Sequence, residues 1–356
     1  MYDHLLKPIL FRFDPEKVHD FFIYLGEYLG SSPWSRAVTE NIYGYSGPEI
    51  SKTVDGIIFR TPFVLAAGFD YNGRLPGILP HIGLGGEEVG SVTARPCAGN
   101  PKPRLKRLPL SQSILVNKGL RNDGVDRVIE RLREWKDDDG KWGKGFVVGV
   151  SIARTNDEQS VPIEAGIEDY CYSFKRLNEE SVGDYYTLNI SCPNAFGAEA
   201  FTEPALLDGL LSAIRKIPCS KPIYVKMPIN VPWNQFSELL KVIDKHGLNG
   251  VVIGNLNKDY SSLDFPSEAP TTYEGGLSGK PCQDLSNELI RKTKGAYGDR
   301  FTLIGAGGVM SSDDAMEKFA AGADLVQLIT GVIYKGPGLV KKMSAAFAQT
   351  SLNATI

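Results

Sequence analysis

Eight short apolar runs, mostly separated by segments of helix length, constrain the fold of this chain more than any other feature. Each run is rich in Val, Ile and Leu, and alternation with helices is typical of parallel βα units. Eight is the number of parallel strands that closes a (β/α)8 TIM barrel. The runs span residues 63–67, 87–92, 146–152, 186–190, 223–227, 250–253, 301–304 and 325–329. We therefore predict an α/β fold of this type for residues 46–356.

Small and polar residues follow nearly every run, where a barrel places its chemistry. Active sites of these barrels lie at the carboxyl ends of the strands. The residues in question are Gly68, Thr93, Ser191, Asn194, Asn230, Asn255, Gly307, Gly308 and Thr330. An insertion of roughly 50 residues separates the second and third runs, and loops of that length are usually functional or disordered. A site built from these strand ends is the expectation.

The first 45 residues form a separate segment, predicted to be a small N-terminal helical extension. Apolar residues between Leu5 and Phe13 make one stripe, and those between Val18 and Leu29 make a second at helical spacing. Asp14 precedes Pro15 as an N-cap, and Gly30 is placed to end the second helix. This hairpin either packs as a lid on the barrel or meets a membrane or an apolar ligand. Its four basic and six acidic residues mean that apolar burial would drive any membrane contact.

Charge and cysteine content exclude several classes of protein. The net charge of −3 argues against nucleic-acid binding, which normally requires a basic face. Five cysteines, odd in number and never spaced C-x-x-C, fit neither a disulfide framework nor a cysteine metal site. No histidine and carboxylate constellation indicates a metal either. This cysteine usage makes a reducing cytoplasm the natural compartment. No apolar run approaches the ~18–20 residues of a membrane span.

Two glycine-containing loops after the seventh and eighth runs favour phosphate binding. The first is Gly305-Ala306-Gly307-Gly308, and the second begins at Thr330-Gly331. Barrels often hold a phosphate between these two loops. A dinucleotide fingerprint is excluded because Met310 stands where it needs a glycine. The alternative is that the glycines only form tight turns.

Several polar residues of the runs are candidates for chemistry. Lys226 interrupts an apolar run, so its ammonium either pairs with a barrel carboxylate or faces an anionic ligand such as a reduced flavin ring. Asn189, Asn194 and Asn255 offer the paired donors and acceptors that suit a planar heterocycle or a carboxamide. Cys192 follows a strand end, where it is either inert packing or a group for proton transfer or nucleophilic attack.

Over nearly its whole length the chain resembles the flavin-dependent dihydroorotate dehydrogenases, most closely the membrane-associated, quinone-reducing class. The motifs that carry the resemblance are Phe13-Asp14-Pro15-Glu16 with His19, Leu65-Ala66-Ala67-Gly68-Phe69-Asp70, Gly90-Ser91-Val92-Thr93, Gly99-Asn100 with Lys102-Pro103-Arg104, Asn189-Ile190-Ser191 with Pro193-Asn194, Gly275-Gly276-Leu277-Ser278-Gly279, Gly305-Ala306-Gly307-Gly308 and Lys335-Gly336-Pro337. The resemblance implies oxidation of dihydroorotate to orotate in pyrimidine biosynthesis, with flavin mononucleotide (FMN) as cofactor and a quinone as electron acceptor.

The resemblance also implies a site. Cys192 would be the catalytic base, taking a proton from carbon 5 while carbon 6 gives a hydride to the flavin. The flavin would contact Ala67, Gly68, Ser91, Ser151, Asn189, Lys226, Gly254, Gly279, Gly307, Gly308, Ile329 and Thr330. The substrate would contact Tyr71, Asn117, Gly119, Leu120, Asn189, Asn194 and Asn255. The quinone would enter between the amino-terminal helices, with the protein bound peripherally at the cytoplasmic side of a membrane.

This sequence departs from the family pattern mainly around the substrate. Cysteine at position 192 is typical of the soluble class, whereas the quinone class normally has serine. Tyr71 replaces a lysine near both flavin and substrate, and Gly254 and Leu256 replace hydroxyl residues. The segment that begins at Asn117 is one residue short. A flavin barrel for another cyclic amide or enone therefore stays open as the alternative, beside a tRNA-acting flavin barrel, which the acidic charge disfavours, and a non-enzymatic scaffold.

Overall fold

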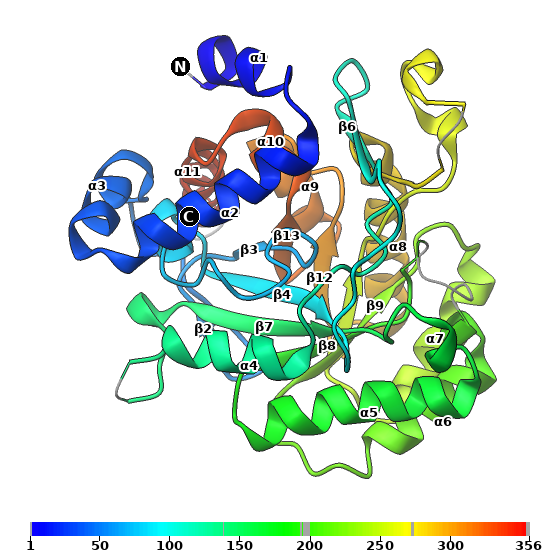
Figure 1. Ribbon diagram of the computed structural model, residues 1–356. Coiled ribbons are helices and arrows are strands. Elements are labelled where there is room, and N and C mark those ends of the chain that lie inside the picture. The colour runs from blue at the N-terminus through cyan, green and yellow to red at the C-terminus, as the bar shows by residue number, and fades with distance from the viewer. Residues whose placement is uncertain (1, 138, 193, 195–199, 272–273, 354–356) are drawn as a thin grey trace.

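Eight parallel strands form a closed barrel in the computed structural model of the chain (Figure 1). The structure describes residues 2–137, 139–192, 194, 200–271 and 274–353. The barrel strands are β3 (Phe63–Leu65), β4 (Gly86–Val92), β7 (Val147–Ile152), β8 (Tyr185–Asn189), β9 (Ile223–Met227), β10 (Gly250–Ile253), β12 (Thr302–Ala306) and β13 (Leu325–Leu328). Each of them overlaps one of the eight apolar runs, so the predicted (β/α)8 TIM barrel is confirmed.

Amphipathic helices cover the outside of the barrel. In α4, for example, Val125, Val128, Ile129 and Leu132 are buried while the charged residues between them face outward. The helices of this layer are α4 (Val125–Glu134), α5 (Ile163–Glu179), α6 (Pro204–Ile214), α7 (Trp233–Lys245), α8 (Gln283–Tyr297), α9 (Ser312–Ala320), α10 (Thr330–Lys335) and α11 (Gly338–Asn353). Short 3-10 turns span Leu79–Ile82, Gly143–Gly145, Glu158–Ser160, Ala200–Thr202, Tyr260–Ser262, Pro266–Glu268 and Lys280–Cys282.

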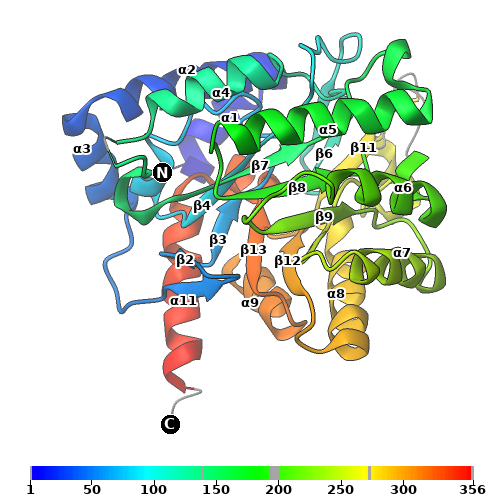
Figure 2. The ribbon, with the colours of Figure 1, turned by 90° about the horizontal axis from the view of Figure 1, so that it is seen from below.

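Five further strands lie outside the barrel, and the sequence analysis did not predict them. The hairpin of β1 (Lys52–Val54) and β2 (Ile57–Phe59) closes the amino end of the barrel, where Val54 and Phe59 pack against the first residues of several strands (Figure 2). The long insertion forms β5 (Leu105–Leu108) and β6 (Ser113–Val116), which pair with β11 (Gly276–Gly279) in an antiparallel sheet. This sheet borders the carboxyl ends of the barrel strands.

The amino-terminal segment differs in detail from the predicted hairpin. Its long helices are α2 (Pro15–Ser31) and α3 (Pro33–Tyr43), preceded by a π-helical turn (Tyr2–Leu6) and α1 (Lys7–Leu10). The Asp14 carboxylate caps α2, accepting hydrogen bonds from the backbone N–H groups of Glu16 and Lys17. Gly30 does not end that helix. A Cβ there would lie 3.0 Å from the backbone of Gly77, so this glycine allows close packing instead. No helix among the described residues is long and apolar enough to span a membrane.

Candidate active site

A cavity of about 490 Å³ leads from the amino-terminal helices to the carboxyl ends of the barrel strands. Val18, Phe22 and Leu25 of α2 line its outer part, and Cys192 and Lys226 line its inner part. A smaller cavity of about 100 Å³ adjoins this inner part. Seven residues border both spaces: Ala67, Lys226, Asn255, Leu256, Ser278, Ile329 and Thr330. The fold therefore connects an apolar entrance to a polar interior.

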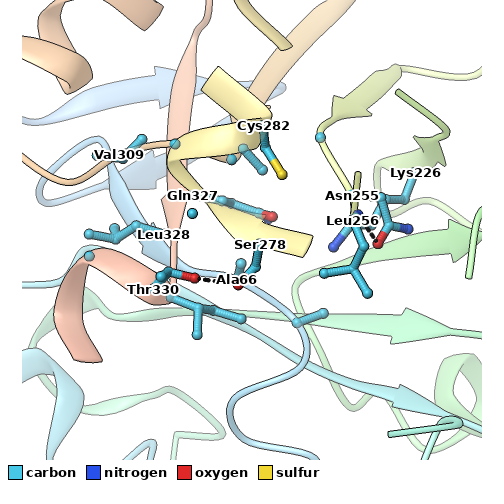
Figure 3. A pocket seen from close by; sticks show the side chains of 18 residues that line it. Ala66, Lys226, Asn255, Leu256, Ser278, Cys282, Val309, Gln327, Leu328 and Thr330 are labelled. Atoms are coloured by element: carbon cyan, nitrogen blue, oxygen red, sulfur yellow. Dashed lines mark hydrogen bonds between the residues drawn. The ribbon is translucent and has the colours of Figure 1, made fainter. Parts of the chain in front are cut away.

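Glycines shape the smaller cavity (Figure 3). Gly307 and Gly308 have φ values of +89° and +81°, which L side chains rarely adopt. A Cβ at Gly308 would lie 2.3 Å from the Cβ of Gln283, and one at Gly279 would lie 2.3 Å from the carbonyl oxygen of Gln112. Opposite these glycines, the hydroxyls of Ser278 and Thr330 are 2.8 Å apart. Backbone N–H groups and hydroxyls in such a concave cup suit a phosphate group.

A buried polar layer lies at the junction of the two cavities. Lys226 is 6% exposed, and burial lowers the pKa of its ammonium, while the charge of Glu88 opposes that shift. Glu88 is fixed in turn, since its Oε2 accepts hydrogen bonds of 2.9 Å from Thr187 and from Gln327. Gln327 lines the smaller cavity, and its buried Oε1 has no hydrogen-bond partner among the described residues. A barrel carboxylate thus influences Lys226 and a cavity borders it, and the two alternatives predicted for this lysine both stay open.

Four predicted asparagines are each oriented by hydrogen bonds. Asn189 donates to the Ser91 hydroxyl at 2.8 Å, and Asn255 donates to the backbone oxygen of Ser191 at 2.6 Å. Asn194 donates to the backbone oxygen of Val116 at 2.8 Å. These three line the larger cavity together with the half-buried thiol of Cys192. Asn117 lines neither cavity; its side-chain oxygen accepts a hydrogen bond of 2.7 Å from Asn100, which also donates to the backbone oxygen of Asn194 at 3.0 Å.

The remaining predicted residues fall at the same place. Tyr71, Gly119, Leu120, Gly68 and Ser91 line the larger cavity. Gly254 lines the smaller one, and Ser151 lies behind Ser91, with the two hydroxyl oxygens 2.8 Å apart. Pro193, part of one motif, lies outside the described residues. The roles assigned to all of these residues stay predictions.

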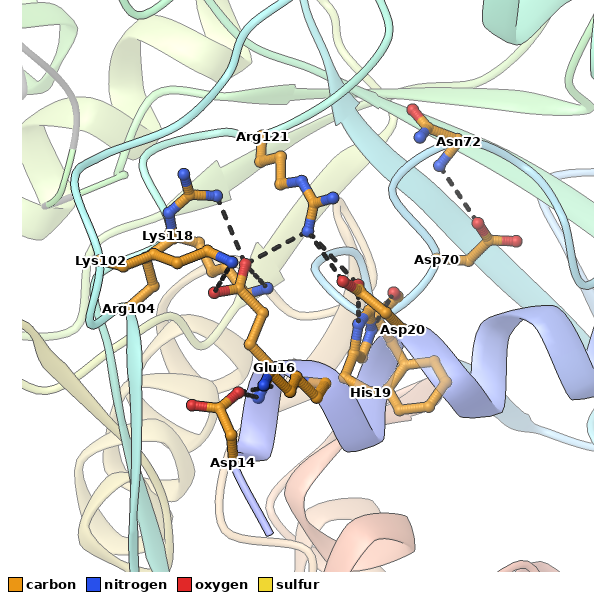
Figure 4. Close-up of polar contacts among 12 residues, drawn as sticks. Asp14, Glu16, His19, Asp20, Asp70, Asn72, Lys102, Arg104, Lys118 and Arg121 are labelled. Carbon is orange, nitrogen blue, oxygen red and sulfur yellow. Dashed lines mark hydrogen bonds and ion pairs between the residues drawn. The ribbon is translucent and has the colours of Figure 1, made fainter.

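Sequence reasoning missed Gln327 and a cluster of charges around Glu16 (Figure 4). The Glu16 side chain is 5% exposed, and four cations lie within ion-pair distance of it: Lys118 at 3.1 Å, Arg121 at 3.2 Å, Arg104 at 3.3 Å and Lys102 at 3.9 Å. Asp20, one turn along α2, pairs with Arg121 at 3.3 Å. Glu16, Lys102 and Arg104 belong to motifs named from the sequence, but only the fold brings four separate positions to one carboxylate.

Fold and cavities together define a (β/α)8-barrel enzyme with its site at the carboxyl ends of the strands. A family model described as dihydroorotate dehydrogenase matches residues 49–350. The chain is 34% identical to the dihydroorotate dehydrogenase (quinone) of Gloeobacter violaceus, covering 97% of this chain and 93% of that protein. It is 36% identical to the one of Polynucleobacter necessarius, covering 97% and 98%. This protein belongs to the dihydroorotate dehydrogenase family.

A solved structure supports the same assignment. The crystal structure of DHODH from Eimeria tenella in complex with ferulenol superposes with a TM-score of 0.81 at 25% identity, covering 96% of this chain and 93% of that one. The ligand-free form of the same Eimeria protein gives a TM-score of 0.81 at 26% identity, with 96% of each chain covered.

Proposed function

We propose that this protein oxidises dihydroorotate to orotate and passes the two electrons to a quinone, with FMN as its cofactor. One observation carries the proposal: a single cavity joins an apolar entrance between the amino-terminal helices to a thiol, a lysine and three asparagines at the barrel mouth. A quinone with an apolar tail suits such an entrance, and a small cyclic imide suits the asparagines.

The residues of the smaller cavity fit FMN. The cup at Gly279, Gly307 and Gly308 would hold the phosphate, with the hydroxyl of Thr330 beside it. The unpartnered side-chain oxygen of Gln327 supplies an acceptor for a ring N–H. The ammonium of Lys226 would then stabilise negative charge on the ring.

Cys192 is the group on the cavity wall best suited to remove a proton from carbon 5 of dihydroorotate. It borders the same space as Asn194 and Asn255, which would hold the amide edges of the substrate in plane. FMN, when bound, accepts the hydride of carbon 6. A base positioned in this way typically accelerates a reaction ~10²–10⁴-fold.

The amino-terminal helices would serve as quinone entrance and as a peripheral membrane contact. Their outer surface carries several large apolar side chains that are more than half exposed: Leu5, Ile9, Phe13, Phe21, Tyr24, Tyr28, Trp34 and Ile42. Exposed apolar surface of this kind is typical of interaction sites. Insertion of these side chains into the interfacial region of a bilayer would bring the entrance to a membrane-dissolved quinone.

The decisive experiment is anaerobic mixing of the purified yellow protein with dihydroorotate. We expect the flavin absorbance to bleach and to recover when a long-chain quinone is added. Failure to bleach with dihydroorotate, in protein that a chemical reductant does bleach, would contradict the proposed substrate.

A different cyclic amide or enone is the second candidate. Leu256 and Tyr71 favour it, because each places an apolar or aromatic group on the wall of the substrate space. A panel of such compounds, screened by flavin bleaching, separates the two candidates. Faster bleaching by another compound than by dihydroorotate would favour this one.

A further inference from the structure

The large cavity carries an excess of positive charge. Four basic residues line it, namely Arg107, Lys118, Arg121 and Lys226, and no carboxylate does so among the described lining residues. The cluster of charges around Glu16 shares Lys118 and Arg121 with this wall. It also carries more positive than negative charge, with four cations against Glu16 and Asp20. Lys118 and Lys226 are buried, and buried cations lack water, so this wall favours an anionic ligand.

Lys118 is the cation of this wall that lies closest to the predicted substrate segment. It stands between Asn117 and Gly119, and its side chain is 9% exposed. Its Nζ lies 3.1 Å from Glu16 and 5.0 Å from the centre of the Tyr71 ring. Tyr71 therefore packs beneath the ammonium and holds it toward the cavity that both residues line.

Glu16 does not depend on Lys118 for its neutralisation. Arg104 and Arg121 lie 3.3 Å and 3.2 Å from the same carboxylate oxygen. Lys118 can thus donate a hydrogen bond to a ligand while Glu16 stays paired with the two arginines. Because an ammonium has three donors, Lys118 can also contact Glu16 and a ligand carboxylate at the same time.

We propose that Lys118 binds the carboxylate of the substrate, supported from below by the ring of Tyr71. The inference rests on the proposed function, since dihydroorotate and orotate carry a carboxylate next to the ring. It also gives Tyr71 a role, because the ring of this tyrosine would orient the ammonium of Lys118, which comes from a neighbouring loop. Lys118 would then determine specificity for ring substrates that carry a carboxylate.

The test compares orotate with uracil, which has the same ring without the carboxylate, by titration of the flavin spectrum of the holoenzyme. Lys118→Met should weaken orotate binding by about 10–100-fold, the usual value of one hydrogen bond to a charged group. Uracil binding should change less than about threefold, within the ±0.5 kcal/mol of a neutral substitution. Lys102→Met is the matched control, because Lys102 also faces Glu16 but is 66% exposed and does not line the cavity.

Equal losses for orotate and uracil, or equal losses in the two lysine variants, would overturn the inference and leave Lys118 a partner of Glu16 only. A rescue covers the case in which Lys118→Met folds poorly. Tyr71→Lys added to Lys118→Met returns a cation to the same place without restoring the contact with Glu16. Recovered orotate affinity supports carboxylate binding, and no recovery contradicts it. Parent protein that binds neither orotate nor dihydroorotate would instead contradict the proposed function.

Discussion

The two ends of the cavity are built on different principles. At the inner end, a space of about 100 Å³ is defined by backbone, because glycines with positive φ face neighbours that leave no room for a Cβ. At the outer end, the part of the cavity of about 490 Å³ that α2 borders is lined mostly by apolar side chains, such as those of Val18, Phe22 and Leu25. Such backbone geometry requires glycine at specific positions of the sequence, whereas many different sequences can form an apolar wall.

The same contrast holds for how each end is fastened. Short hydroxyl and amide hydrogen bonds secure the inner end, such as the one between Ser278 and Thr330. Ion pairs from Glu16 and Asp20 of α2 fasten the outer end to the insertion. Substitutions at the inner end should therefore abolish function, and those at the outer end should reduce it only in part.

The largest effect is expected from Gly308→Ala. The new Cβ would lie 2.3 Å from the Cβ of Gln283 at a φ of +81°, so the loop must move away from the phosphate position. Loss of two hydrogen bonds to a charged group, at about 1.5–3 kcal/mol each, would weaken FMN binding ~10²–10⁴-fold. Flavin content of the purified protein measures this. Gly295→Ala in α8, with nothing within 4 Å of the new Cβ, is the control and should keep its flavin.

Next in size is Cys192→Ala, which should retain flavin and slow its reduction by dihydroorotate. Loss of a general base predicts a decrease of ~10²–10⁴-fold. Anaerobic stopped-flow absorbance gives the rate directly. Cys171→Ala, a half-buried cysteine of α5 that is not part of either cavity wall, should reduce at the parental rate. A parental rate for Cys192→Ala would mean that this thiol is packing.

Sequence predicted what backbone and periodicity dictate. The eight strands follow from runs of β-branched residues, and the start of α2 follows from Asp14 and Pro15. The tight loop at Gly307 and Gly308 follows from the sequence, since their positive φ values favour glycine, and its role in holding a phosphate stays a prediction.

Sequence did not predict what only long-range contact creates. The short strand β11 lacks a continuous apolar pattern and forms because it pairs with β6, far away in the chain, whereas β5 pairs with β6 in a local hairpin. Glu16 belongs to a motif named from the sequence, but its contact with Lys118, 102 positions away, arises only in the fold. Gly30 carries the signal of a helix end, yet its function is close packing against Gly77.

Obstruction of the outer end should separate the two half-reactions. Val18→Trp adds volume at the cavity wall, and overpacking typically costs about 1–3 kcal/mol. We expect the KM for a long-chain quinone to rise roughly 10–100-fold, while flavin reduction by dihydroorotate and reoxidation by a small dye continue. Phe21→Trp, at an exposed position off the cavity wall, is the control. Unchanged kinetics with long-chain quinone would place the electron exit elsewhere.

Removal of apolar groups from the outer surface should weaken membrane binding more modestly. Trp34 is 76% exposed and Tyr28 is 74% exposed. Burial of one large apolar side chain contributes about 1.5–3 kcal/mol at most, so Trp34→Ser should lower vesicle binding roughly tenfold. Co-sedimentation with vesicles measures it, and the result should depend little on salt. Strong salt dependence would indicate an electrostatic contact instead.

The smallest effect concerns Asp20, whose ion pair fastens the outer end. The hydrogen bond with His19, followed by the charge of Arg121, lowers the pKa of this carboxyl from 3.8 to about 2, although partial burial acts in the opposite direction.

A carboxyl whose pKa is lower in the folded state stabilises the fold at pH values above 3.8, and this contribution is lost as the pH falls toward about 2. Because the side chain is 38% exposed, solvent screening limits the contribution to under about 1 kcal/mol. Thermal melts of the parent and of Asp20→Asn should thus differ most at neutral pH and converge in acid. Ser278→Ala, which removes a hydroxyl pair at the inner end, should differ from the parent by the same amount at every pH. A difference in melting temperature between the parent and Asp20→Asn that is the same at every pH would mean that packing, and not charge, holds α2 in place at this point.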